Sequence, residues 1–174
     1  MRFFLIVLVL FITACSFGDR RVIANEQWVE VFLSDSDGVA PIKFNRIADA
    51  LVAIENAKHQ QHFNEKIKIV LSEGEFREKL SVSSDGLIFM GQGPSKTKIV
   101  FDDYASRLQP TGNSTGTAGS ATIRVDSSDV AFVSLTIEND FDFLYQDGLD
   151  ASAADKVNGT QAVAVHLSAT SDKV

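Results

Sequence analysis

Cysteine and excess positive charge are the first things that this chain lacks. Cys15 is the only cysteine among 174 residues, so an internal disulfide is excluded. The 16 Lys and Arg residues are outnumbered by 23 Asp and Glu, for a formal net charge of −7. We expect no nucleic-acid partner, because there is no surplus of cations to neutralise phosphates. A hydrophobic content of 45% is enough for one domain with a real core.

A long hydrophobic run is also missing. The apolar run Phe3–Phe11 follows Met1-Arg2 and is too short to span a bilayer, but it has the shape of a signal-peptide core. Ile12 to Cys15 resembles the bacterial lipobox, in which cleavage leaves a lipid-modified cysteine at the new N-terminus. We therefore expect a signal peptide at 1–14, a lipidated Cys15 that anchors the protein to the membrane, and a polar tether over 15–27. The alternative is an ordinary secretory signal with an incidental cysteine.

By the same resemblance, Ser16 after the lipidated cysteine favours sorting to the outer membrane of a Gram-negative cell. The predicted localisation is therefore an outer-membrane lipoprotein of the cell envelope, with secretion as the alternative.

Helical periodicity is scarce in the rest of the chain. Phe44 to about Lys58 carries apolar residues at helical spacing and predicts one amphipathic helix, the only convincing one. Short apolar runs separated by turn residues predict strands at Trp28–Leu33, Ile67–Leu71, Leu80–Val82, Leu87–Met90, Lys98–Phe101, Ala121–Val125, Val130–Ile137 and Gln161–Leu167.

This pattern predicts an all-β architecture, with a right-handed parallel β-helix as the favoured fold and a β-sandwich close behind. The runs are unevenly spaced and look buried, which is typical of stacked coils. The helix favours the β-helix further, because an amphipathic helix near the start can cover the open end of the stack.

Five stretches, in order, resemble segments of the pectinesterase (pectin methylesterase) family, especially its bacterial branch. The resemblance is carried by Asp35–Gly38 with Phe44–Leu51, by Ile67–Leu80, by Leu87–Gly93 with Thr97–Ile99, by Leu135–Phe143, and by Gln161–Val165. It covers the chain from about Val29 to the end, so 28–174 is expected to be the N-terminal part of the family's β-helix domain. The family fold agrees with the pattern.

The resemblance implies hydrolysis of the methyl esters of polygalacturonate (pectin) to pectate and methanol, without a cofactor. In the family one Asp attacks the ester, a second acts as acid and base, and an Arg orients the nucleophile. Gln161 matches a glutamine whose amide donates to the oxyanion, which would make it both catalytic and substrate-binding. Thr117 matches a threonine that contacts substrate, although a locally bonded loop hydroxyl is an equal alternative.

The family's later motifs, which hold the two Asp and the Arg, have no counterpart before Val174. We therefore expect this chain to be an inactive fragment of an esterase. The sequence Tyr145–Gly148 looks like one of those motifs, but it precedes Gln161 instead of following it, and we interpret it as an acidic loop.

Neither a metal nor a partner protein is expected. His59, His62 and His166 show no metal-ligand spacing, and a capped β-helix is expected to be a monomer. Two other functions are compatible with the pattern. One is hydrolysis of acyl thioesters on the same fold, and the other is non-catalytic binding of polysaccharide.

Overall fold

In the computed structural model, residues 27–33, 41–61 and 66–168 are described. Eleven strands, two α-helices and one 3-10 helix occur in these ranges: β1 Val29–Leu33, β2 Ile42–Phe44, α1 Ile47–Gln61, β3 Ile67–Leu71, β4 Gly74–Arg77, β5 Leu80–Val82, β6 Leu87–Met90, β7 Thr97–Phe101, η1 Ala118–Ser120, β8 Ile123–Val125, β9 Ala131–Val133, β10 Thr136–Asn139, α2 Phe143–Gly148 and β11 Val165–Leu167.

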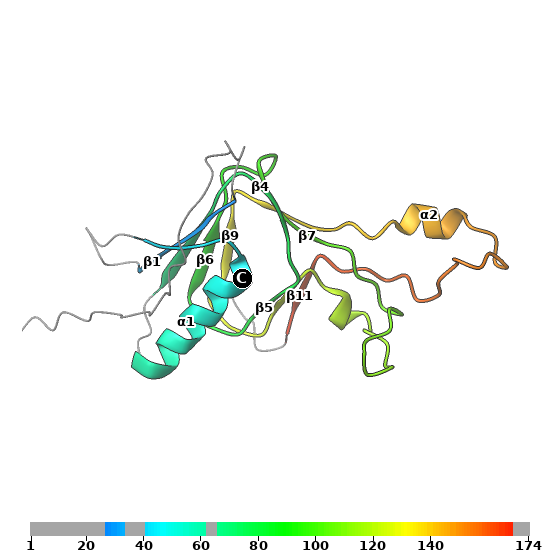
Figure 1. Ribbon diagram of the computed structural model, residues 1–174, viewed down its shortest axis with the longest axis horizontal. Helices are drawn as coiled ribbons and strands as arrows, with labels where there is room; N and C mark the ends of the chain where they lie inside the picture. Colours follow the sequence, from blue (N-terminus) through cyan, green and yellow to red (C-terminus); the bar gives the residue numbers. More distant parts are fainter. Residues whose placement is uncertain (1–26, 34–40, 62–65, 169–174) are drawn as a thin grey trace, which may run out of the picture.

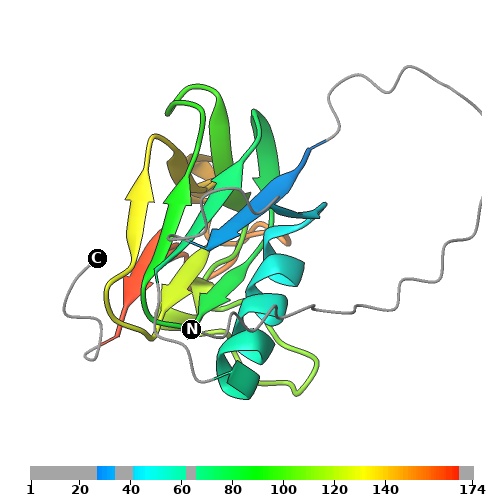
Figure 2. The same ribbon diagram turned by 90° about the vertical axis from the view of Figure 1, so that its left-hand side faces the viewer.

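The strands form a parallel β-helix of three coils, as the sequence predicts. Each coil gives one strand to each of three sheets, which have the parallel orders β3-β6-β9, β4-β7-β10 and β5-β8-β11. Figures 1 and 2 show the coils stacked on one another. Residues that face the interior therefore lie above one another from coil to coil, as Ile69, Phe89 and Phe132 do.

The first coil is closed at its outer edge by the segment that precedes it. Strand β1 pairs antiparallel with both β2 and β3, and α1 contacts β1, β2 and β5 (Figure 2). The helix buries Ile47, Ala50 and Ile54 in the core. This is the capping position that the sequence predicts, and it removes unpaired backbone groups from the end of the stack.

Helix α1 begins on a buried carboxylate. Glu78 is 7% exposed, and its two oxygens accept hydrogen bonds from the Ile47 and Ala48 backbone N–H groups at 2.9 and 3.0 Å. A carboxylate at this position accepts hydrogen bonds from two of the N–H groups that the first turn of a helix leaves without partners. Its negative charge also interacts favourably with the positive N-terminal end of the helix dipole. The helix starts three residues later than predicted, because Phe44 pairs with Val29 in the sheet.

Burial falls from the first two coils to the third. Interior side chains such as Phe76, Phe89 and Ile99 are 0–2% exposed, whereas Phe132 and Ile137 of the third coil are only partly buried. The apolar core is therefore centred between the first and second coils, where each side chain has neighbours on both sides.

The structure also differs from the sequence predictions in other details. Val130–Ile137 is not one strand, because Ser134 has a φ of 53° and separates β9 from β10. Gln161–Ala164 lies outside β11, which starts at Val165. Gly74–Arg77 forms a strand that was not expected. Tyr145–Gly148 lies in a second helix, α2, and not in a loop.

No helix among the described residues is long and apolar enough to cross a membrane. Cys15, the predicted lipidation site, lies outside the described residues, as do the signal peptide and nearly all of the predicted tether. Gln27, the last residue of that tether, is described, and its side-chain amide donates to the Glu75 carbonyl at 2.6 Å.

Candidate functional site

Two long connections leave the stack between its second and third sheets. We call residues 102–122, between β7 and β8, the first excursion, and residues 140–164, between β10 and β11, the second excursion. Both project from the same side of the β-helix in Figure 1, and α2 lies far out on the second. The two predicted site residues, Thr117 and Gln161, lie on the first and the second excursion respectively.

The returning limb of the second excursion is bound to the first excursion through backbone hydrogen bonds. The Ala105 N–H donates to the Gln161 carbonyl at 2.9 Å, and the Thr122 N–H donates to the Val163 carbonyl at 3.0 Å. The Ser106 N–H donates to the carbonyl of Gly159 at 3.0 Å. Gly159 has a φ of 65°, and a Cβ there would lie 3.1 Å from the Cβ of Ser106, so a glycine suits this close contact.

Gln161 is exposed on this limb, and its backbone is held while its side chain lies at the surface. The prediction that a strand begins at Gln161 is wrong, because β11 starts at Val165. The position still suits a donor for a substrate oxygen, because an exposed amide offers two N–H groups without a charge.

Thr117 is also exposed and stands at the N-cap of η1. Its carbonyl accepts hydrogen bonds from the N–H and the Oγ of Ser120 at 3.2 and 2.7 Å, but its own side chain does not cap the turn. Gly116, its neighbour, donates to the carbonyl of Ala105 at 2.7 Å. Since Ala105 also donates to Gln161, the structure brings both predicted residues into one cluster of loops.

Charged residues hold the base of the first excursion. Asp103 is 4% exposed, and its carboxylate forms ion pairs with Lys79 and with the Arg107 Nε, the latter at 3.0 Å. Arg107 also lies over the ring of Tyr104, 5.0 Å from its centroid. The two cations offset the cost of burying this carboxylate and hold the base of the first excursion to the stack.

The outgoing limbs of the two excursions are joined as well. Tyr104 stacks on Phe141 with ring centroids 4.5 Å apart. Arg77 forms ion pairs with Asp102 and Asp140, and the hydrogen bond to Asp140 raises the pKa of Arg77 above its ordinary value. These contacts were not predicted, because each joins residues that are far apart in the sequence.

The glutamine of Tyr145–Gly148 has a structural role. Gln146 is 9% exposed, its Oε1 accepts from the Val157 N–H at 2.9 Å, and its Nε2 donates to the Asp155 carbonyl at 3.3 Å. The side chain therefore holds the outer part of the second excursion together. It cannot at the same time serve an exposed ester, which agrees with the sequence-based interpretation that this motif is not a site.

His166 lies on β11 beside Arg124 of β8, and its buried Nδ1 has no hydrogen-bond partner among the residues that the structure describes. His59 lies in the last turn of α1, and His62 lies outside the described residues. Among the residues that the structure describes, no group of three or more His, Cys, Asp or Glu residues could hold a metal ion.

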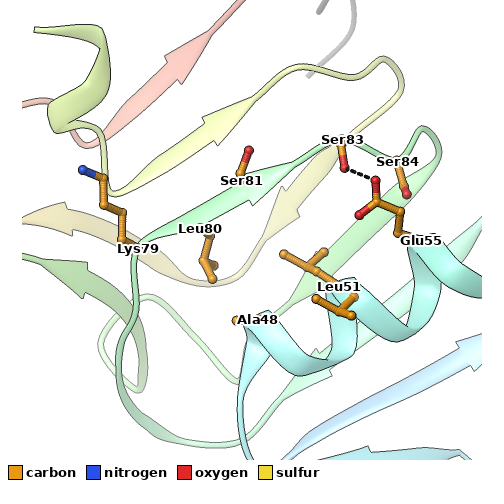
Figure 3. A pocket seen from close by; sticks show the side chains of 9 residues that line it. Ala48, Leu51, Glu55, Lys79, Leu80, Ser81, Ser83 and Ser84 are labelled. Carbon is orange, nitrogen blue, oxygen red and sulfur yellow. Dashed lines mark hydrogen bonds between the residues drawn. The ribbon is translucent and has the colours of Figure 1, made fainter. Parts of the chain in front are cut away.

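A shallow hollow of about 150 Å³ lies elsewhere, between α1 and β5. Figure 3 shows Leu51 and Leu80 at its apolar floor and the hydrogen bond of 3.2 Å from Ser83 to Glu55 at its rim. Neither Thr117 nor Gln161 lines it. We therefore attribute the hollow to the packing of the capping helix and not to the candidate site.

The sequence is similar to two curated proteins named pectinesterase A. The relatives from Dickeya chrysanthemi and from Dickeya dadantii are each 31% identical to this chain over 140 residues, which is 80% of it. The chain spans only 36% of the length of each relative. No protein-family model matches the chain.

The fold is similar to solved pectin methylesterases. The structure from Yersinia enterocolitica has a TM-score of 0.67 at 32% identity over 74% of this chain and 38% of its own. The structure from Erwinia chrysanthemi has a TM-score of 0.64 at 34% identity, over 77% and 36%. A third, solved in complex with a hexasaccharide, has a TM-score of 0.65 at 32% identity, over 77% and 36%.

The curated relatives match 80% of this chain by sequence, and the solved structures match 74–77% of it by fold. Over about a third of those proteins' length, this chain is similar to pectinesterases in both sequence and fold.

Proposed function

We infer that this chain is part of a pectinesterase, a carboxylic ester hydrolase that converts methyl-esterified polygalacturonate to pectate and methanol. The observation that carries this proposal is that Gln161 and Thr117 are both exposed and lie on two excursions that are hydrogen-bonded to each other through Ala105. The relatives support it, since they carry the same activity in their names and one was solved with a hexasaccharide.

In the proposed reaction an Asp carboxylate attacks the ester carbonyl, and the carbonyl oxygen becomes negative. The amide of Gln161 donates hydrogen bonds to that oxygen more strongly in the transition state than in the ground state. Methanol then leaves with a proton from the second Asp, and water hydrolyses the acyl-enzyme. Thr117 contributes a hydroxyl that contacts the polysaccharide near the ester.

The two Asp and the Arg of this mechanism are expected in motifs that follow Gln161–Val165 in the family, beyond the sequence of this chain. We therefore expect residues 1–174 alone to release no methanol. The protein made from the complete gene, to its own stop codon, should release methanol from highly esterified pectin.

The decisive experiment measures methanol release by that complete protein from esterified pectin, with de-esterified pectate as the control substrate. Hydrolysis of an acyl thioester but not of pectin would replace the proposal with the thioesterase alternative. Binding of esterified pectin without methanol release would replace it with the polysaccharide-binding alternative.

We also propose that Cys15 is lipidated and anchors the protein in the outer membrane. The support comes from the sequence Ile12 to Cys15 and from the polar segment that follows. Labelling cells with radioactive palmitate should mark the normal protein and leave Cys15→Ala unlabelled. Labelling of the variant would contradict the proposal, and fractionation of the envelope would show which membrane holds the protein.

A further inference from the structure

Asn139 stands where both excursions leave the stack. It is the last residue of β10 and lies opposite Phe101, the last residue of β7. The first excursion begins directly after Phe101 and the second directly after Asn139. A half-buried polar side chain at this point can therefore reach the backbone of both.

The side chain of Asn139 contacts both ends of both excursions. Its Nδ2 lies 2.9 Å from the Asp103 carbonyl and 3.0 Å from the Ser120 carbonyl, near the start and the end of the first excursion. The same nitrogen lies 3.2 Å from the Val163 carbonyl, near the end of the second. Its Oδ1 accepts from the Phe141 N–H at 3.1 Å, near the start of the second. One amide thus joins four segments of backbone.

Asparagine suits this position because it combines a two-hydrogen donor and an acceptor on a short side chain. An aspartate would place a carboxylate oxygen against three carbonyl oxygens. An alanine would leave these three carbonyls and one N–H without the amide, and partly buried polar groups that lose their partners destabilise the structure around them.

Short paths lead from Asn139 to both candidate site residues. Ser120, which Asn139 contacts, is fully buried and bonds through its N–H and Oγ to the Thr117 carbonyl. Val163, which Asn139 also contacts, follows Gln161 by two residues, and the Gln161 carbonyl is held by Ala105. The amide of Asn139 therefore fixes the distance between the two limbs that carry the candidate site.

We propose that Asn139 is a positioning residue for the ester hydrolysis assigned above, an inference that rests on that proposed function. It sets the separation between the amide of Gln161 and the hydroxyl of Thr117, and it acts only through the backbone. A misplaced Gln161 loses transition-state stabilisation while polysaccharide still binds. Removal of the Asn139 amide should therefore lower kcat more than it raises KM.

The first test needs no enzymatic activity. Hydrogen–deuterium exchange is compared for the normal complete protein, for Asn139→Ala, and for Asn113→Ala, a matched change at an exposed position of the first excursion. We expect the amides of Ala105 and Thr122 to exchange about five- to tenfold faster in Asn139→Ala only, which is the loss of one net hydrogen bond. The amides of β6 should not change. Unchanged exchange in the excursions, or equally faster exchange in β6, would overturn the positioning role.

The second test is a double-mutant cycle on methanol release with Asn139→Ala and Gln161→Ala. If Asn139 acts through Gln161, its substitution lowers kcat about tenfold in the normal protein and has little further effect once Gln161 is alanine. A purely structural role predicts the same fold-change in both backgrounds, and that result would overturn the inference. Should Asn139→Ala not fold, Asn139→Ser, which keeps a shorter donor and acceptor, replaces it with smaller effects of the same kind.

The two tests separate the inference from the function on which it rests. If neither the normal protein nor any variant releases methanol, the proposed function fails, and the positioning of Gln161 for that reaction by Asn139 fails with it. The exchange experiment would then still establish, or refute, that this amide holds the two excursions together.

Discussion

The stack and the two excursions are held together by different interactions. In the first two coils the interior side chains are apolar and nearly unexposed, with Phe89 and Ile99 at 0%. The excursions rely on backbone hydrogen bonds, on ion pairs around Asp103 and on the amide of Asn139. The difference teaches that stability resides mainly in the stack and the candidate chemistry in the excursions, so substitutions should separate the two.

The largest effect should come from the core of the stack. Phe89 is fully buried and stacks on Phe132 with ring centroids 5.0 Å apart. Phe89→Ala should lower the free energy of unfolding by about 3–5 kcal/mol, since it removes a large buried side chain and leaves a cavity. Urea denaturation measures this change in the free energy of unfolding. Val133→Ala is the control, because Val133 is partly exposed. A loss no larger than that of the control would contradict the importance of the stack.

Gln161→Ala, unlike Phe89→Ala, should lower activity and leave stability almost unchanged. Loss of one oxyanion donor is expected to lower kcat for methanol release about 10²–10³-fold. The free energy of unfolding should stay within about 0.5 kcal/mol, because the side chain is exposed. Gln109→Ala, another exposed amide on the first excursion, should leave kcat unchanged. Equal activity of the two variants would remove Gln161 from the proposed mechanism.

Substitutions of Glu78 test how the capping helix α1 is held to the end of the stack. Glu78→Ala leaves the Ile47 and Ala48 N–H groups without their acceptor, and we expect a loss of about 1–3 kcal/mol in the free energy of unfolding. Glu78→Gln keeps one acceptor oxygen and should lose less. Thermal unfolding followed by circular dichroism compares them. If Glu78→Ala is as stable as the normal protein, the helix does not depend on this carboxylate.

The smallest effect concerns a charge on the surface of the stack. The Arg124 Nε donates to the Asp126 carboxylate at 2.7 Å, and this hydrogen bond holds the pKa of Asp126 below its ordinary value of 3.8. A carboxyl whose pKa is lower in the folded state stabilises the fold above pH 3.8, and this contribution is lost as the pH falls through its folded pKa.

Because the pair lies near solvent, its contribution should stay below about 1 kcal/mol. Asp126→Asn should therefore lower stability slightly at pH 7 and should lose less stability than the normal protein between pH 5 and pH 2. Urea denaturation across that range measures both. Asp147→Asn is the control, because Asp147 is exposed and forms no ion pair within the described part of the chain. An identical pH dependence of Asp126→Asn and the normal protein would contradict the pKa shift.

The stack could be predicted from local patterns because its strands are bounded by local signals. The strands Leu80–Val82 and Leu87–Met90 are correct to the residue, since turn residues flank each short apolar run. The break at Ser134 was missed because no glycine, proline or asparagine marks it, and only its φ of 53° ends the strand.

The roles of Gln161 and Thr117 remain predictions from the sequence, and the structure around Gln161 differs from the one that the sequence indicates. The alternation after Gln161 is typical of a strand, yet the Gln161 carbonyl bonds to Ala105, which lies in the other excursion. Asn139 lies in Leu135–Phe143, one of the stretches that resemble the family. Nothing in the sequence shows that four distant backbone segments meet at its amide. Contacts of this kind depend on how the excursions fold against each other, and local sequence patterns do not record them.

The parallel register also bears on how such a protein can change over evolution. Ile67 lies opposite Leu87, whereas Leu80 lies opposite Ile123, so the first excursion about doubles the length of chain between paired strands. Each doubling of a loop adds only about 0.6 kcal/mol of closure entropy. The stack therefore tolerates longer or shorter excursions, and new binding chemistry can arise there by insertion or deletion while every strand keeps its partner.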